Sequence, residues 1–395
     1  MTVVFPKPYE YRQLSLSCGI LPEKAEEAAT LWHKLKPDVK RDQVVISNFN
    51  KYFKKIAKVG IETIESTEPL QSDRPPKKDP IPNAVYVEPP CIFIGRGDHP
   101  LRGTFKPRIK EKDVTWNTDP TCEWLISWPD PITGKQKYLY PPDRDRSDSE
   151  LAKFECARKL KKNIYKFRRY NNFNLQNTDS KKAQLAVCAY VIDKICIRAG
   201  NEKDSDAAET VGCCTLQLKH VELIPPYSLK FDFLGKDSIQ FKKKVSVDSI
   251  VFKHLEEFCK KKSPDDYIFD LVETSSLNNY LDSLVPGITA KVFRTCHGST
   301  AFQKLLKLDD KSNSIKTPKS IYTEANQAAA KICNHKKTKG NSTSLSLTTS
   351  KVNYLDPRIT VAFCKKSGMS IESVFSNTLL KKHAWALDTS SEFVF

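Results

Sequence analysis

One stretch near the C-terminus, residues 350–360 (SKVNYLDPRIT), constrains the fold more than any other. Asp356 followed by Pro357 predicts the start of a helix. An aspartate at the N-cap accepts a hydrogen bond from a backbone N–H, and a proline in the first turn is tolerated because the N–H that it lacks would have no partner within the helix. The helix is expected to run through residues 361–363. Tyr354 then lies just ahead of a helix N-terminus, where the dipole and free amides favour negative charge. The residues alone fit either a core tyrosine or a phenol held ready to attack a phosphate.

Charge and composition limit the class of partner. The chain has 395 residues, with 64 Lys and Arg against 47 Asp and Glu, and a formal net charge of +17. The basic residues are interleaved with aromatic ones rather than confined to a tail, which favours a polyanionic partner. No apolar run approaches the ~18 residues that a membrane span needs, so no membrane association is expected. Twelve cysteines without a C-x-x-C pair predict reduced thiols in an intracellular protein and no metal site.

The first 147 residues have the pattern of a mixed α/β domain. Helices are expected over residues 22–32, where Pro22 precedes an acidic first turn, and over residues 49–61. Residues 62–90 are rich in Pro, Glu, Lys and Asp and predict a loop or an exposed connector. Residues 124–128 and 136–140 predict a β-hairpin.

The rest of the chain is mainly helical by pattern. Helices are expected over residues 149–166 and 181–197, and further helices start near residue 289 and end near residue 335. Residues 229–247 predict a hairpin with Gly235-Lys236-Asp237 at its turn. Residues 340–350 are rich in Gly, Ser and Thr, lack a helical period and predict a flexible linker. The expected domains are 1–147, a core at 148–338, a short flexible linker at 339–350 and a C-terminal domain at 351–395.

Three polar residues of this part have a structural and a functional interpretation each. Arg198, near the end of a helix, can offset the helix dipole. Lys236 on a glycine turn is of a kind that is normally solvated, and a lone histidine at a helix end, such as His335, is usually structural. Taken one by one, these residues leave the choice open.

Taken together, the segments resemble one family, the eukaryotic type IB DNA topoisomerases. The resemblance is carried by KVNYLDPRIT, FCKKSGMSIE and HAWALD, and runs almost unbroken from Asn353 to Leu387. Further matching segments are EPPCIFIGRGDHP (88–100), RAGNEKD (198–204) followed by ETVGCC (209–214), FDFLGKDSI (231–239), KVFRT (291–295) and CNH (333–335).

The resemblance implies a catalytic site and a set of DNA contacts. It makes Tyr354 the nucleophile, Arg198 and Arg294 the groups that bind the scissile phosphate, His335 a donor to a nonbridging oxygen, and Lys236 the general acid. The implied DNA-contacting residues are Arg96, Lys291, Asp237 and Asn353. Of these, Arg96, Asp237 and Asn353 match positions that touch camptothecin-type inhibitors at the nick, so such an inhibitor is an expected ligand of the cleaved complex.

These residue types suit cleavage of a phosphodiester by a phenol. The transition state carries extra charge on the nonbridging oxygens, which forked hydrogen bonds from two guanidinium groups can hold. The leaving 5′-oxygen needs a proton, which a lysine can supply. The 3′-phosphotyrosyl bond conserves the energy of the broken link, so the strand can be resealed. Neither a P-loop nor a two-metal carboxylate cluster is present in the sequence, so no cofactor, ATP or Mg²⁺ is expected.

The resemblance also implies an α+β fold that acts as a two-lobed clamp on double-stranded DNA. A mixed α/β cap would precede a mainly helical catalytic domain of the tyrosine recombinase and topoisomerase IB kind, with a C-terminal helical domain carrying the tyrosine. Larger relatives have a long helical linker, whereas only 18 residues separate His335 from Tyr354 here. A monomer in the nucleus is expected, or a viral or host-cell compartment if the chain is virally encoded.

Two other functions fit parts of the pattern. Tyrosine site-specific recombinases use a similar set of five residues, but they usually have His-x-x-Arg where this chain has Lys291-x-x-Arg294, and they lack the G-C-C and N-Y-L-D-P-R segments. A non-enzymatic DNA clamp would be expected to have lost one of the five, and none is lost.

Overall fold

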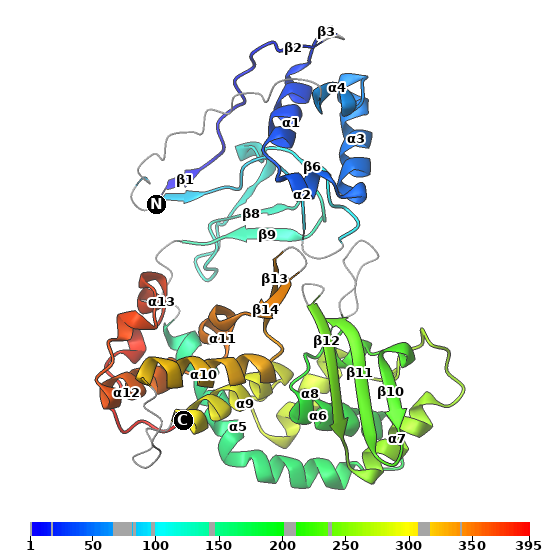
Figure 1. The fold of residues 1–395 in the computed structure, drawn as a ribbon, viewed down its shortest axis with the longest axis vertical. Helices are drawn as coiled ribbons and strands as arrows, with labels where there is room; N and C mark the ends of the chain where they lie inside the picture. Colours follow the sequence, from blue (N-terminus) through cyan, green and yellow to red (C-terminus); the bar gives the residue numbers. More distant parts are fainter. Residues whose placement is uncertain are drawn as a thin grey trace. The chain divides into compact units, whose positions relative to one another are not determined.

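The structure is a computed structural model, and its residues form two compact units. It describes residues 2–16, 19–65, 81, 84–95, 99–141, 147–200, 211–235, 239–306, 317–339 and 342–395. The units divide between residues 144 and 145, three residues before the boundary that we predicted between residues 147 and 148. Both contain helices and strands (Figure 1), so the fold class is α+β as predicted.

Unit 1, residues 2–141 of the described chain, combines a few helices with short strand pairs. Its helices are α1 (Glu23–His33), α2 (Pro37–Lys40), α3 (Gln43–Ala57), α4 (Glu62–Glu65) and the 3-10 turn η1 (Glu111–Asp113). Its strands are β1 (Thr2–Val4), β2 (Ser15–Leu16), β3 (Gly19–Ile20), β4 (Ala84–Tyr86), β5 (Cys91–Ile92), β6 (Phe105–Lys106), β7 (Thr115–Trp116), β8 (Ile126–Pro129) and β9 (Gln136–Leu139). Strands β7, β8 and β9 form an antiparallel sheet, and its β8–β9 pair is the predicted hairpin.

Aromatic packing holds the helices of unit 1 together. Trp32 of α1 stacks on Phe49 of α3 with ring centroids 4.6 Å apart, and Phe49 stacks on Phe53 one turn further on. All three side chains are fully buried. The loop predicted for residues 62–90 is wrong at its two ends, because α4 occupies 62–65 and β4 pairs in parallel with β1. That parallel partner lies more than 80 positions away, so the local composition gave no sign of it.

Two basic residues of unit 1 are neutralised by carboxylates within the unit. The Lys106 ammonium lies 2.5 Å from a Glu88 oxygen and 2.6 Å from an Asp130 oxygen, and its side chain is 4% exposed. Arg108 pairs with Glu27 at 2.5 Å. These two cations of the strand-like run at 106–110 therefore stabilise unit 1 itself.

Unit 2, residues 147–395 of the described chain, is mainly helical with one three-stranded sheet. Its helices are α5 (Ser147–Asn174), α6 (Ser180–Ile195), α7 (Ser249–Cys259), α8 (Thr274–Leu284), α9 (Ala290–Leu305), α10 (Pro318–Ile332), α11 (Leu347–Asn353), α12 (Pro357–Ser367) and α13 (Asn377–Lys382). Short 3-10 turns are η2 (Cys213–Thr215), η3 (Leu218–His220), η5 (Ile371–Ser373) and η6 (Ala384–Ala386). Its strands are β10 (Val221–Ile224), β11 (Ser228–Gly235), β12 (Ile239–Ser246), β13 (Lys336–Lys339) and β14 (Ser342–Leu345).

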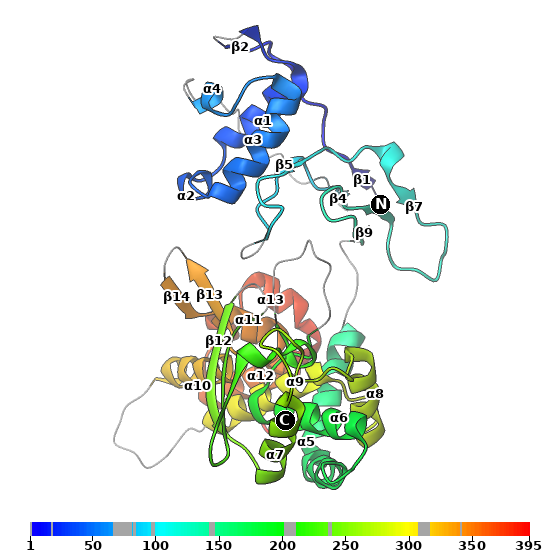
Figure 2. The ribbon, with the colours of Figure 1, turned by 90° about the vertical axis from the view of Figure 1, so that its right-hand side faces the viewer.

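In unit 2, helices α9 and α10 lie between the sheet and the C-terminal helices. In Figure 1 the β10–β11–β12 sheet lies on one side of α9 and α10, and α12 and α13 lie on the other. Figure 2 shows the molecule from the side of the sheet. The β11–β12 pair is the hairpin predicted for residues 229–247. One hydrophobic core includes Phe293 and Phe302 of α9, Phe231 of β11, and Ile359 and Phe363 of α12. The C-terminal segment therefore packs into the same unit as the helices before it.

The flexible linker predicted at residues 339–350 is wrong for the residues that the structure describes there. Strand β14 pairs antiparallel with β13, and α11 begins at Leu347. A helix of seven residues is too short to show a clear apolar period. The β13–β14 pair also has tertiary support. Helix α10 precedes β13 in the chain, α11 follows β14, and these two helices pack together. The residues that bring the tyrosine to its place are thus ordered by tertiary contacts.

None of the helices in the described part of the chain combines the length and the apolar character that crossing a membrane requires.

The buried side chain of His383 gives a testable effect of pH on stability. Neither ring nitrogen has a hydrogen-bond partner among the described residues, and the ring packs against Phe375 with centroids 5.6 Å apart. Burial, helped by the charge of Lys382, lowers the pKa of His383 to about 4. Below pH ~6.5 this histidine is protonated in the unfolded chain but stays neutral in the folded protein. The free energy of unfolding therefore falls progressively as the pH falls towards 4.

We therefore expect His383→Phe to make unfolding less sensitive to acid. Its unfolding free energy relative to the parent should rise by on the order of 1–2 kcal/mol between pH 7.5 and pH 5. Urea titrations of both proteins at the two pH values measure this difference. An equal effect of the substitution at both pH values would show that His383 titrates normally in the folded protein.

Candidate functional site

Tyr354 lies between two helices of unit 2 whose ends fix its backbone. It follows α11, and its N–H donates to the Ser350 carbonyl at 2.9 Å. Two residues later, an Asp356 carboxylate oxygen accepts the Arg358 N–H at 3.0 Å and caps α12, with Pro357 in the first turn as predicted. Tyr354 is 4% exposed. Its place ahead of a capped helix is therefore as the local sequence indicated.

A serine of the neighbouring helix α9 holds the same backbone from the other side. The Ser299 hydroxyl donates to the Tyr354 carbonyl at 2.9 Å and accepts the Asp356 N–H at 3.0 Å. Ser299 is fully buried. Because Arg294 lies on the same helix, this contact fixes the tyrosine backbone relative to that arginine.

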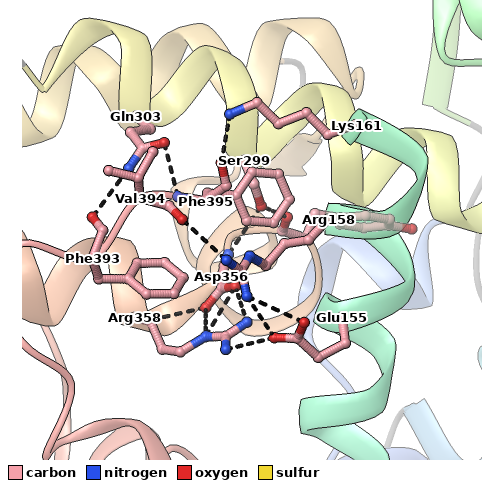
Figure 3. Close-up of polar contacts among 11 residues, drawn as sticks. Glu155, Arg158, Lys161, Ser299, Gln303, Asp356, Arg358, Phe393, Val394 and Phe395 are labelled. Atoms are coloured by element: carbon pink, nitrogen blue, oxygen red, sulfur yellow. Dashed lines mark hydrogen bonds and ion pairs between the residues drawn. The ribbon is translucent and has the colours of Figure 1, made fainter. Parts of the chain in front are cut away.

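An ion-pair network anchors the start of α12 to α5. Arg358 donates from Nε and Nη2 to the fully buried Asp356 carboxylate, at 3.0 and 2.7 Å, and from Nη1 to Glu155 of α5 at 2.6 Å. Figure 3 shows the guanidinium between the two carboxylates, with the Phe393 ring beside it. Since the network begins two residues after Tyr354, it restricts motion of the tyrosine backbone.

Arg294 reaches the centre of the site from α9 and is held by backbone carbonyls. Nη1 donates to the Cys196 carbonyl and Nη2 to the Cys333 carbonyl, both at 2.6 Å. The side chain is 4% exposed, and the Nε–H has no hydrogen-bond partner among the described residues. Among the described residues, its polar contacts include these two carbonyls and His335, and none is with a carboxylate. Arg294 is thus a buried cation without a protein counter-ion in the part of the chain that the structure describes.

Arg198 is placed by the end of α6 and by a close backbone contact. The helix was predicted to continue to residue 197, but it ends at Ile195, with Cys196 in the left-handed region at φ 58°. This turn frees the Cys196 carbonyl for Arg294 and takes Arg198 out of the helix, so a role for Arg198 in offsetting the helix dipole is wrong. The Arg198 carbonyl accepts the Cys213 N–H at 2.7 Å.

Two glycines allow the backbone after Arg198 to lie directly against the backbone before Cys213. A Cβ atom on Gly212 would lie 2.3 Å from the Gly200 Cα, and one on Gly200 would lie 2.6 Å from the Gly212 Cα. Gly200 also has a φ of 82°, which disfavours other residues. The glycines of the RAG and VGCC segments therefore serve the close approach of two chain segments.

His335 follows α10 and is fully enclosed. Its N–H donates to the Ala330 carbonyl at 2.8 Å, and Asn334 before it adopts a φ of 50°. The ring contacts Ser350 Oγ through Nδ1 at 2.7 Å and Arg294 Nη2 through Nε2 at 3.2 Å. Burial, together with the charges of Arg294 and Arg198, lowers the pKa of His335 to about 3. The imidazole is therefore neutral at physiological pH.

The phenol of Tyr354 lies against these groups. The Arg294 guanidinium carbon is 5.0 Å from the Tyr354 ring centroid, and the His335 ring centroid is 4.7 Å away. Burial raises the pKa of the phenol, but the positive charges of Arg294 and Arg198 outweigh it and leave the pKa below the usual value. Such an environment favours a phenolate and an anionic ligand beside it.

The predicted site residues fall into three groups in the structure. Arg198, Arg294 and His335 line one cavity of about 90 Å³, together with Gly235 and Thr349, and Tyr354 contacts Arg294 and His335. Lys291 and Asn353 are exposed on α9 and α11, and neither lines this cavity. Arg96, Lys236 and Asp237 lie outside the described residues. Gly235 and Ile239, the residues that bound the hairpin turn, both line the cavity.

Ser299 and Ser350 are parts of the site that our sequence analysis did not find. Each is a small polar residue within a helix, and only its buried contacts with Tyr354 or His335 give it significance. In the described part of the chain, no three or more His, Cys, Asp and Glu side chains are grouped so that they could hold a metal ion. The arrangement is thus a cluster of two guanidiniums and a neutral imidazole beside a phenol, and its positive charge favours an anionic ligand.

Comparisons with known proteins cover both units. The family model described as eukaryotic DNA topoisomerase I, catalytic core, matches residues 143–362, and the one described as eukaryotic DNA topoisomerase I, DNA binding fragment, matches residues 77–122. The chain is 35% identical to DNA topoisomerase 1 beta of Arabidopsis thaliana over 409 aligned positions, which cover 78% of this chain and 45% of the relative. It is 34% identical to DNA topoisomerase 1 of Homo sapiens, in an alignment that covers 78% of this chain and 53% of the human protein. It is 33% identical to DNA topoisomerase I, mitochondrial, of Rattus norvegicus, in an alignment that covers 78% of this chain and 68% of the rat protein. The chain spans about half the length of the plant and human relatives.

Proposed function

The chain belongs to the eukaryotic DNA topoisomerase I family, and from this premise we propose that it is a type IB topoisomerase, which relaxes positive and negative supercoils in double-stranded DNA. The Tyr354 oxygen attacks a backbone phosphorus, a 3′-phosphotyrosyl bond forms, and the bond to the 5′-oxygen breaks. The duplex then rotates about the intact strand. Attack of the 5′-hydroxyl on the phosphotyrosine reverses the step and releases the phenol. The bond energy is retained throughout, so the cycle needs neither ATP nor a metal ion.

The observation that carries this proposal is the state of Arg294. Burying a cation without a counter-ion is costly, and proteins normally pair such a group. The carbonyls of Cys196 and Cys333 hold two of its nitrogens, while its Nε–H has no partner among the described residues. A phosphate beside Tyr354 would supply both the missing charge and the missing acceptor.

The remaining groups of the cavity fit the transition state of the same step. Arg198 and Arg294 would bind the nonbridging oxygens as charge develops there, because guanidinium groups donate forked hydrogen bonds without a conformational change. The lowered pKa of Tyr354 makes the nucleophile easier to ionise. We assign the general acid to Lys236, since the residues on either side of its turn line the cavity. We assign Arg96, Lys291, Asp237 and Asn353 to DNA contacts beside the cleaved step.

Several finer features form part of the proposal. The two units would act as the two lobes of a clamp on duplex DNA, with residues 1–147 as the cap, 148–338 as the catalytic core and 351–395 as the domain that carries the tyrosine. The net charge of +17 supports a DNA partner. We propose a monomer in the nucleus, although one relative is named as a mitochondrial enzyme.

Relaxation of negatively and positively supercoiled plasmid in EDTA without ATP tests the activity. We expect a ladder of topoisomers of both starting signs, and a protein-linked 3′ end when the reaction is stopped with detergent. A non-enzymatic clamp would retard the plasmid without changing its linking number. A site-specific recombinase would exchange strands between two duplexes of defined sequence and would leave other plasmids unrelaxed.

Sensitivity to camptothecin is a prediction that follows from this assignment. Arg96, Asp237 and Asn353 all have the identities that match the inhibitor-contacting positions of the family. We expect the drug to slow religation by at least about tenfold, since stacking in the nick keeps the 5′-hydroxyl away from the phosphotyrosine. Religation of a preformed suicide complex with saturating drug and with solvent alone measures the effect, and equal rates would contradict the prediction.

A further inference from the structure

His335 makes two side-chain contacts that together determine where its proton lies. Nε2 is 3.2 Å from Arg294 Nη2, and Nδ1 is 2.7 Å from Ser350 Oγ. All three side chains are buried, with His335 4% and Ser350 1% exposed. Both ring nitrogens are therefore paired with side chains of the site in the DNA-free protein.

These contacts place the proton on Nδ1 in the DNA-free protein. A guanidinium nitrogen only donates, so Nε2 must be the acceptor of the Arg294 N–H. The ring is neutral and has a single N–H, since burial and the nearby arginines lower the pKa of His335 to about 3. That N–H is then on Nδ1 and donates to Ser350 Oγ. In this tautomer the histidine offers no N–H towards the cavity that Arg198 and Arg294 line.

The proposed reaction needs the opposite tautomer. A histidine that stabilises a nonbridging phosphate oxygen must present Nε2–H, because an unprotonated Nε2 would repel that oxygen. A backbone carbonyl as the partner of Nδ1 would prevent this change, since it only accepts. A serine hydroxyl can accept from Nδ1–H or donate to a bare Nδ1. Ser350 is therefore a partner that permits both forms.

We propose that Ser350 is a positioning residue that allows His335 to change tautomer when the scissile phosphate binds. The inference rests on the proposed function. The phosphate takes over the Arg294 Nη2–H, and water donates a proton to the freed Nε2. The transient imidazolium then releases its Nδ1 proton to water, and the Ser350 hydroxyl turns to donate to Nδ1. The ring is neutral before and after the exchange, and Nε2–H then faces a phosphate oxygen.

The backbone of Ser350 links this change to the nucleophile. Its carbonyl accepts the N–H groups of Tyr354 at 2.9 Å and Leu355 at 3.1 Å. The hydroxyl that holds the histidine and the carbonyl that holds the tyrosine thus belong to one residue. Ser350→Ala removes only the hydroxyl and keeps the carbonyl, which separates the two roles.

Nitrogen-15 NMR of histidine-labelled protein tests the tautomer directly, with His335 assigned by its loss in His335→Asn. In the free protein we expect a protonated Nδ1 and an unprotonated Nε2. With a duplex oligonucleotide bound to the uncleaving Tyr354→Phe protein, we expect the two shifts to exchange. In Ser350→Ala we expect the free and bound spectra to keep the same tautomer.

Single-turnover cleavage tests the consequence. Ser350→Ala should cleave about 10²-fold more slowly, the loss typical of one missing transition-state donor, with unchanged DNA affinity. Ser350→Thr keeps the hydroxyl and should recover the rate to within a few-fold. Thr348→Ala, which removes an exposed hydroxyl from the same helix, is the matched control and should cleave like the parent.

The outcomes separate this inference from the proposed function. A His335 tautomer that is the same with and without DNA would overturn the inference, and so would parent-like cleavage by Ser350→Ala. If the parent protein binds DNA but never cleaves it, the proposed function fails, while the NMR spectra still decide whether the tautomer changes.

Discussion

Replacing Tyr354 with phenylalanine is expected to abolish covalent attachment to DNA and to reduce supercoil relaxation by at least about 10⁴-fold, the scale on which removal of a covalent nucleophile acts. The substitution deletes only the hydroxyl. The Arg294 guanidinium and the His335 ring also contact the aromatic ring of Tyr354, at 5.0 and 4.7 Å between the groups, and these ring contacts should remain. The backbone contacts of residue 354 with Ser299 and Ser350 remain as well. DNA affinity should therefore be unchanged.

Detergent-trapped adducts on an end-labelled duplex measure the first effect, and filter binding at fixed salt measures affinity. Tyr165→Phe is a matched control, because Tyr165 is 82% exposed on α5 and lies outside the site. It should form adducts at the parent rate. Continued relaxation by the Tyr354 variant would show that another group attacks the phosphate.

Replacing Lys236 with alanine should slow cleavage by about 10²–10⁴-fold, the contribution usual for a general acid. The reason is chemical: the 5′-oxygen is a strongly basic leaving group, and departure without a proton is slow. The strands on either side of the turn are paired to their ends, with Gly235 opposite Ile239, and both residues line the cavity with Arg198 and Arg294. We therefore propose that Lys236 acts on a phosphate bound in this cavity.

The leaving group itself provides the decisive control. A substrate with sulfur in place of the bridging 5′-oxygen has a good leaving group that needs no proton, so the Lys236 variant should cleave it at nearly the parent rate. Lys244→Ala removes an exposed lysine from the same hairpin and should behave like the parent on both substrates. If the Lys236 variant is equally impaired on the oxygen and sulfur substrates, Lys236 does not donate the proton.

Short-range signals predicted the elements of the fold where they were complete within the sequence. The Asp356-Pro357 pair marked the start of α12, because the cap bond and the proline act within one helical turn. The alternation over residues 229–247 predicted the β11–β12 hairpin, since the two paired strands are close together in the sequence. Pattern reasoning was wrong where partners came from elsewhere. Strand β4 has its partner at the N-terminus, and α11 is stabilised by α10 rather than by its own composition.

The sequence by itself determined which chemical groups are present and, through the resemblance of whole segments, the family to which they belong. It also determined the local geometry at Tyr354, because helix caps depend on neighbouring residues. Only the tertiary structure decided how the groups meet. Arg294 is held by carbonyls 98 and 39 positions away, and Ser299 holds the Tyr354 backbone across 55 positions. Such contacts have no sequence period, because they arise from packing of helices that are distant along the chain. The burial that keeps His335 neutral, and the contact with Ser350 that sets its tautomer, follow from the same packing.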